Sequence, residues 1–91
     1  MKHFYRDISG LGNVAVGRHA QERMLNAKIS EATFERVLRF GSDTQICTDV
    51  VWRQKDGLRI VILNNPTPNV GAKLIKTVYR VNAPARVVGG R

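Results

Sequence analysis

A histidine and an arginine stand four residues apart, at His19 and Arg23, in a segment rich in helix-forming residues. On a helix, side chains four residues apart meet on one face. Such a pair suits RNA cleavage through attack by the 2′-hydroxyl, in which side chains move protons and stabilise the phosphorane without a metal ion. The alternative is structural: His19 packs or caps the start of the helix, and Arg23 pairs with a carboxylate such as Glu35.

A second set of candidate residues lies on a predicted strand at residues 73–81, where side chains alternate between two faces. One face is expected to carry Ile75, Thr77, Tyr79 and Val81, and the other Leu74, Lys76, Val78 and Arg80. Unless the strand twists or bulges, only one of these sets can face a substrate. The alternative places Tyr79 at the edge of the core and the cations on a solvated face.

The only tryptophan, Trp52, is followed directly by Arg53. An aromatic ring beside a cation can stack an unpaired base above a basic groove. The alternative is that Trp52 packs in the core or against a helix. The hairpin signal Asp56-Gly57 places Arg53 and Arg59 on neighbouring strands, where both would add to a basic sheet face.

Charge is unevenly distributed along the 91 residues, which carry a formal charge of +8 and have an isoelectric point near 10.6. All seven acidic residues occur at or before Asp56, whereas residues 57–91 hold six basic residues and no acid. A surplus of this kind favours an anionic partner. We expect RNA or another nucleic acid, with an acidic antitoxin or an acidic surface of a host protein as alternatives.

Several classes of protein are excluded by what the sequence lacks. The longest uninterrupted apolar runs, such as Ile60–Leu63, are far below the roughly 20 residues of a membrane span. The first residues carry no apolar stretch typical of a secretion signal. Cys47 is the only cysteine, and neither it nor His3 has partners at metal-ligand spacing. We therefore expect a cytoplasmic protein with no membrane contact, no metal ion and no other cofactor; a domain cut from a larger exported toxin would look the same.

The elements that must position these residues follow from periodicity and turn signals. Two helices are predicted at about 17–28 and 31–40, the second with Ser30 as N-cap and Gly41 at its end. After Gly41, β-branched and aromatic residues predict strands on both sides of Asp56-Gly57.

The order of these elements predicts an α+β fold with two N-terminal helices packed on a three- to four-stranded antiparallel sheet. Residues 58–63 are expected to form its central strand, and the proline-rich residues 64–72 a loop. The chain divides into an N-terminal arm at 1–17, a single α+β domain at 18–82 and a basic tail at 83–91.

The segment His19–Met24 (HAQERM), followed by Ile29–Glu31 and by Lys76–Arg80 (KTVYR), resembles a family of small bacterial and phage domains of unknown function with an H-A-x-x-R-M motif. The resemblance covers roughly residues 16–82. That family is grouped with the barnase, EndoU, colicin and RelE-like fold, which includes metal-independent ribonuclease toxins. The loop at 64–72 is longer and richer in proline than the turn expected from the resemblance.

The resemblance implies a role for basic and tyrosine side chains near the last strand. Together with the helical pair, it predicts a catalytic set of His19, Arg23, Tyr79 and Arg80. Nucleic acid would be held by Arg53, Arg59, Lys73 and Lys76. The predicted function is a toxin-type endoribonuclease that cleaves RNA by 2′-hydroxyl attack. The alternative is a non-catalytic phage or mobile-element module that binds nucleic acid or an acidic host surface; a third is pairing with a protein partner.

Overall fold

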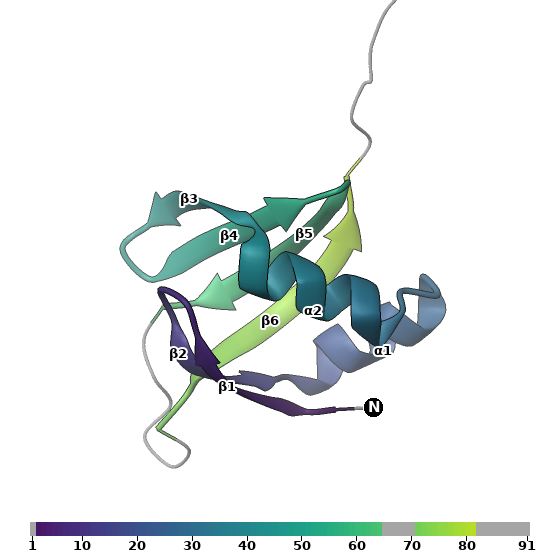
Figure 1. Cartoon of the computed structure of the whole chain (residues 1–91), viewed down its shortest axis with the longest axis horizontal. Helices are drawn as coiled ribbons and strands as arrows, with labels where there is room; N and C mark the ends of the chain where they lie inside the picture. Colours follow the sequence, from purple (N-terminus) through teal and green to yellow (C-terminus); the bar gives the residue numbers. More distant parts are fainter. Residues whose placement is uncertain (1, 65–70, 82–91) are drawn as a thin grey trace, which may run out of the picture.

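A computed structural model describes residues 2–64 and 71–81 and contains six strands and two helices (Figure 1). The strands are β1 (Phe4–Ile8), β2 (Gly12–Val16), β3 (Ser42–Cys47), β4 (Val50–Lys55), β5 (Leu58–Leu63) and β6 (Lys73–Arg80), and the helices are α1 (Arg18–Asn26) and α2 (Glu31–Phe40). The expected tail at 83–91 and most of the expected loop at 64–72 lie outside the described residues.

The predicted architecture is wrong in the size and composition of the sheet and in the position of the helices. One sheet contains all six strands in the order β1-β2-β6-β5-β4-β3. Its strands pair antiparallel except β2 and β6, which run parallel, so the sheet is mixed. Both helices follow the first two strands instead of opening the fold. The protein is therefore a mixed α+β domain in which strands predominate.

The N-terminal residues, expected as an arm, form the hairpin β1–β2 at one edge of the sheet. Tyr5, Ile8, Val14 and Val16 of this hairpin are buried in the core. A register shift between Tyr5 and Ile8 breaks the two-residue period that would have indicated a strand. The hairpin also depends on the pairing of β2 with β6, which no local sequence signal reveals.

The second predicted helix is confirmed at residues 31–40. The hydroxyl of Ser30 accepts a hydrogen bond from the backbone N–H of Thr33, and Glu31 in the first turn complements the helix dipole. Phe34, Val37 and Leu38 are fully buried, as their spacing predicted. The first predicted helix is slightly shorter than expected, at Arg18–Asn26, and buries Ala20 and Met24.

The hairpin predicted at Asp56-Gly57 is also confirmed. Both residues have positive φ, 54° and 78°, as a two-residue type I′ turn requires. The turn sets the register of β4 on β5, in which Gln54 lies opposite Arg59 and Trp52 opposite Val61.

The last strand departs from simple alternation. Val61 pairs with Thr77 but Ile62 pairs with Ile75, so Lys76 is an extra residue in a β-bulge. The bulge moves Ile75 onto the face of Val78, and both are fully buried. The prediction that Ile75 shares a face with Thr77 and Tyr79 is therefore wrong.

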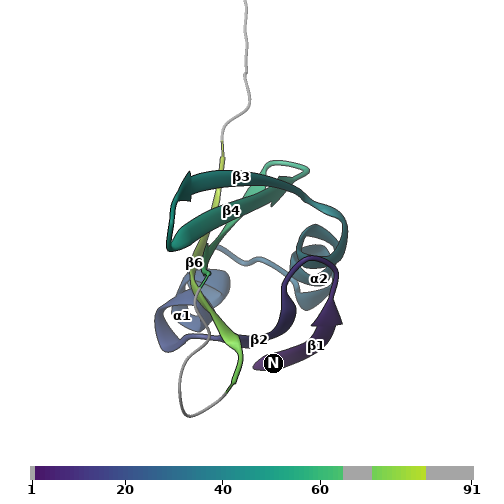
Figure 2. The ribbon, with the colours of Figure 1, turned by 90° about the vertical axis from the view of Figure 1, so that its left-hand side faces the viewer.

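The sheet curves around α2, which packs on β4 and β5 within its concave side (Figures 1 and 2). In contrast, α1 follows β2 directly and packs along β6. Side chains from both helices and from the facing side of the sheet form one core cluster. Neither helix is long and apolar enough to cross a membrane.

The burial of Tyr5 predicts that the stability of the fold depends on pH. Its side chain is 1% exposed and lies against Phe34, with ring centroids 5.7 Å apart. Burial, followed by the charges of Glu31 and Glu35, raises the pKa of Tyr5 to about 12, above its ordinary value of 10.0. Because the folded state holds the phenol proton more tightly, this contribution to stability is complete below pH 10 and declines as the pH rises towards 12.

We expect Tyr5→Phe to lose less stability than the wild type between neutral pH and about pH 11. Urea denaturation of both proteins at each pH measures the difference. The two proteins differ only in the phenol hydroxyl, so the difference between their pH profiles reports on Tyr5. An identical loss in both would contradict the role of Tyr5.

Candidate functional site

One face of the sheet, opposite the buried core residues of β5, carries a patch that spans three strands. Strand β5 buries Leu58, Ile60 and Ile62 and leaves alternate side chains half-buried on the other side. Residues directly opposite in neighbouring strands share a face. On β4, β5 and β6 the register therefore defines an open face of nine residues: Val50, Trp52, Gln54, Arg59, Val61, Leu63, Leu74, Thr77 and Tyr79.

Arg59 is the centre of the open face and touches three neighbouring side chains. Its guanidinium carbon lies 3.8 Å from the centroid of the Trp52 ring, a close cation–π contact. Its Nε donates to Oε1 of Gln54 at 2.9 Å, and Nη1 donates to the hydroxyl of Tyr79 at 3.2 Å. The guanidinium is thus held at its face and at its edge by side chains from β4 and β6.

The electrostatic character of the open face is positive. None of its nine residues is acidic, and Arg59 forms no ion pair among the residues that the structure describes. The exposed Lys76 adds a cation at the bulge of β6. At the far edge, the guanidinium carbon of Arg6 lies 5.9 Å from the Phe4 ring. This face can attract an anion and offers aromatic surface beside the charge.

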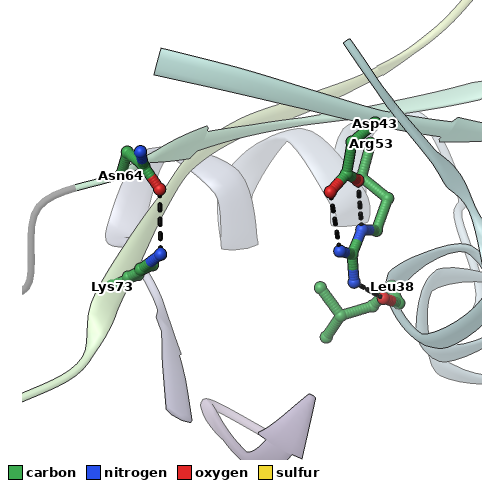
Figure 3. Close-up of polar contacts among 5 residues, drawn as sticks. All are labelled: Leu38, Asp43, Arg53, Asn64 and Lys73. Atoms are coloured by element: carbon green, nitrogen blue, oxygen red, sulfur yellow. Dashed lines mark hydrogen bonds and ion pairs between the residues drawn. The ribbon is translucent and has the colours of Figure 1, made fainter. Parts of the chain in front are cut away.

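Arg53, which the sequence placed in a basic sheet face, is instead buried beneath the sheet and only 4% exposed. Figure 3 shows its guanidinium between Asp43 and the end of α2. It donates to both carboxylate oxygens of Asp43, at 2.6 and 2.9 Å, and to the carbonyl of Leu38 at 2.7 Å. These bonds join α2, β3 and β4, so the geometry assigns Arg53 a structural position.

The two lysines predicted to bind nucleic acid lie in different surroundings. Lys73, at the start of β6, donates from Nζ to Oδ1 of Asn64 at 2.8 Å (Figure 3). Lys76 is exposed, and its ammonium group has no hydrogen bond or ion pair among the described residues. Of the four residues predicted to hold nucleic acid, Arg59 lies on the open face and Lys76 at its bulge.

The helical pair is exposed on α1. The side chains of His19 and Arg23 make no hydrogen bond, ion pair or ring contact with any described residue. The alternative pairing of Arg23 with Glu35 is therefore not formed; Glu35 instead accepts from Nε of Arg39 at 2.8 Å. That bond holds the pKa of Glu35 below its ordinary value.

Tyr79 and Arg80 are separated by the sheet, because consecutive strand residues point to opposite faces. Tyr79 shares the open face with Arg59, whereas Arg80 lies opposite the buried Leu58. The Nη2 of Arg80 is 3.4 Å from the carbonyls of Ala27 and Lys28, where a cation complements the C-terminal end of α1.

These contacts do not bring the four residues of the predicted catalytic set together. No hydrogen bond, ion pair or ring contact among the described residues joins His19 or Arg23 to Tyr79 or Arg80. His19 stands at the start of α1, about 12 Å along the helix axis from the carbonyl that Arg80 approaches. The structure unites Tyr79 with Arg59 and Trp52 instead.

Gln54 contacts Arg59, as Trp52 and Tyr79 do, but it was not identified from the sequence. A signal for it was present, because a two-residue turn at Asp56-Gly57 places Gln54 directly opposite Arg59.

Among the described residues, no three His, Cys, Asp or Glu side chains come together as a metal site. Neither a family model, nor a curated protein, nor a solved structure matches the chain.

Proposed function

We propose that the protein is a non-catalytic module that binds single-stranded nucleic acid on the open face of its sheet. The observation that carries this proposal is that Arg59 stacks on Trp52 and donates hydrogen bonds to Gln54 and Tyr79. These four residues form the Arg59 cluster. Proteins that bind unpaired nucleic acid combine aromatic or guanidinium planes for the bases with cations for the phosphates. The open face contains both kinds of group within one cluster.

Electrostatics support an anionic polymer as the ligand. The chain has a formal charge of +8, and the nine residues of the open face include no acid to repel phosphate. Neutralising phosphates releases counterions, so this attraction falls steeply as salt rises. Lys76 can reach a strand that crosses the bulge beside Thr77.

A single strand suits this surface better than a duplex. Trp52 and Tyr79 are half-buried, with the sheet beneath them and their remaining surface at the open face. Planar side chains bind bases through their faces, which are covered by neighbouring bases in a duplex and accessible in an unpaired strand.

We propose a module that does not cleave RNA because the residues predicted to be catalytic lie apart. Transesterification needs an acid and a base at the same phosphate. His19 is on α1 without a described partner, and the hydroxyl of Tyr79 bonds only to Arg59 among the described residues. We therefore expect the protein to hold RNA without cutting it.

The decisive measurement is the affinity for a fluorescently labelled single-stranded RNA of about twelve nucleotides, by anisotropy at two salt concentrations. If about three phosphates are neutralised, affinity should fall about twentyfold between 50 and 200 mM salt. Arg59→Ala should weaken binding about tenfold at fixed salt. The wild type must bind the oligonucleotide, since failure to do so refutes the proposal.

Arg36→Ala is the matched control for the loss of one positive charge. Its side chain is on α2, which packs on the core side of the sheet, and is 64% exposed and 3.9 Å from Asp56. It should change affinity less than about twofold, because one peripheral charge contributes little at moderate salt. Equal losses for both variants would show that net charge, and not the Arg59 cluster, drives binding. RNA from the same samples should stay intact; cleavage abolished by His19→Ala would instead support a ribonuclease.

A further inference from the structure

We infer that Arg59 acts mainly as a stacking surface for one unpaired base. This inference rests on the proposed function and specifies how the open face holds its ligand. The observation behind it is the position of the guanidinium, whose carbon lies over the Trp52 ring at 3.8 Å from the ring centroid, a separation that suits stacking. The plane is fixed by hydrogen bonds at Nε and Nη1.

The edge of the guanidinium is partly engaged, because two of its five N–H groups already donate hydrogen bonds. Nε has a single hydrogen, which it donates to Gln54. A side-on, two-bond interaction with phosphate uses Nε together with Nη2, so it would require this hydrogen bond to break. The hydroxyl of Tyr79 accepts a second hydrogen bond, from Nη1.

The face of the guanidinium away from Trp52 is where a base can stack, while three N–H groups at Nη1 and Nη2 remain without a described acceptor. One side lies on Trp52, and Tyr79 meets the group through its hydroxyl, with its ring centroid 5.7 Å from the guanidinium carbon. A base that stacks on the other side extends a column of base, guanidinium and indole. Such stacking depends on a planar group, whereas phosphate attraction depends on charge.

Arg59→Lys separates these two roles because it keeps the charge and removes the plane. The probes are two single-stranded DNA oligonucleotides of about twelve nucleotides, one of deoxyadenylate and one with abasic residues throughout. Both have the same phosphates. We expect the wild type to bind the deoxyadenylate strand about tenfold more tightly than the abasic strand.

Arg59→Lys should lose most of this preference while the salt dependence of its binding stays that of the wild type. Far-ultraviolet circular dichroism and a thermal melt show whether the variant remains folded. Lys76→Ala is the complementary variant. It removes a cation that attracts phosphate, so it should weaken the binding of both strands equally and reduce the salt slope.

The outcomes distinguish the two proposals. If the wild type binds both strands equally, or Arg59→Lys keeps the preference for bases, the stacking role is overturned while nucleic-acid binding stands. If the wild type binds neither the deoxyadenylate strand nor RNA, the proposed function fails and this inference fails with it.

Discussion

Arg53→Met is expected to lower the free energy of unfolding by about 3 kcal/mol. Arg53 is 4% exposed, and its guanidinium donates three hydrogen bonds, two to Asp43 and one to the carbonyl of Leu38. Methionine fills a similar volume but donates none of these bonds. The Leu38 carbonyl, in the last turn of α2, would then be left without its donor, and a buried acceptor without a partner is costly.

Urea denaturation followed by circular dichroism measures this loss, with Arg36→Met as the control. Arg36 is 64% exposed and 3.9 Å from Asp56, so its replacement should change stability by less than about 0.5 kcal/mol. Similar values for the two variants would contradict a structural role for Arg53. Asp43→Asn retains an acceptor for Arg53 but removes the opposing charge, so its loss separates charge pairing from hydrogen bonding.

The burial of Arg53 is one feature of the structure that the sequence could not predict. Alternation places Val51 and Arg53 on one face of β4 and Trp52 on the other. Arg53 was expected in a basic sheet face because the hairpin places it on the strand next to that of Arg59. Its partner Asp43 is on the edge strand β3, whose six residues are all exposed. Nothing in the local pattern of β3 indicates that this aspartate pairs beneath the sheet.

Elements with strong local signals were predicted correctly. The cap at Ser30 and the apolar spacing from Phe34 to Leu38 define α2, and Asp56-Gly57 defines the hairpin of β4 and β5. The N-terminal strands were missed because a register shift interrupts β1 and because β2 pairs with β6, far along the chain. Parallel pairing between distant segments depends on the tertiary fold, which local propensity does not describe.

The candidate site was only partly predictable for the same reason. Arg59 and Trp52 were identified individually, and the turn between their strands fixes their proximity. Tyr79 meets Arg59 because the two residues lie directly opposite each other in the β5–β6 register. The bulge at Lys76 lets Leu74 share the open face with Thr77 and Tyr79, whereas a strict two-residue period would have placed Tyr79 on the opposite face from Leu74. Neither this register nor the bulge follows from simple alternation along the strand.

The same region of α2, β3 and β4 contains the second large stability effect, at Gly41. The sequence predicted Gly41 as the end of α2, and the helix does end at Phe40. Glycine often follows a helix because it readily adopts the left-handed conformation. Gly41 instead has an extended backbone, with φ −72° and ψ 164°, which any residue can adopt. Space, and not backbone conformation, is what requires glycine here.

Gly41→Ala is expected to destabilise the protein by about 2 kcal/mol. An added Cβ would lie 2.6 Å from the carbonyl oxygen of Val37, 2.8 Å from Cγ of Arg53 and 3.1 Å from the carbonyl oxygen of Gln54. Two of these atoms are backbone and the third belongs to a side chain held by three hydrogen bonds, so none can move freely. Relief of the clash requires α2 and β4 to separate.

Gly71→Ala is not a suitable control, because that residue has positive φ and alanine would be strained there. Ala32→Ser is better, since residue 32 is exposed on α2 and the change adds one atom in open solvent. It should alter stability by less than about 0.5 kcal/mol in the same urea titration. Because β4 carries Trp52 on its other face, a shift of β4 in Gly41→Ala should also change the tryptophan emission of the folded protein. A stable Gly41→Ala variant with unchanged emission would show that α2 and β4 are packed less closely than these distances require.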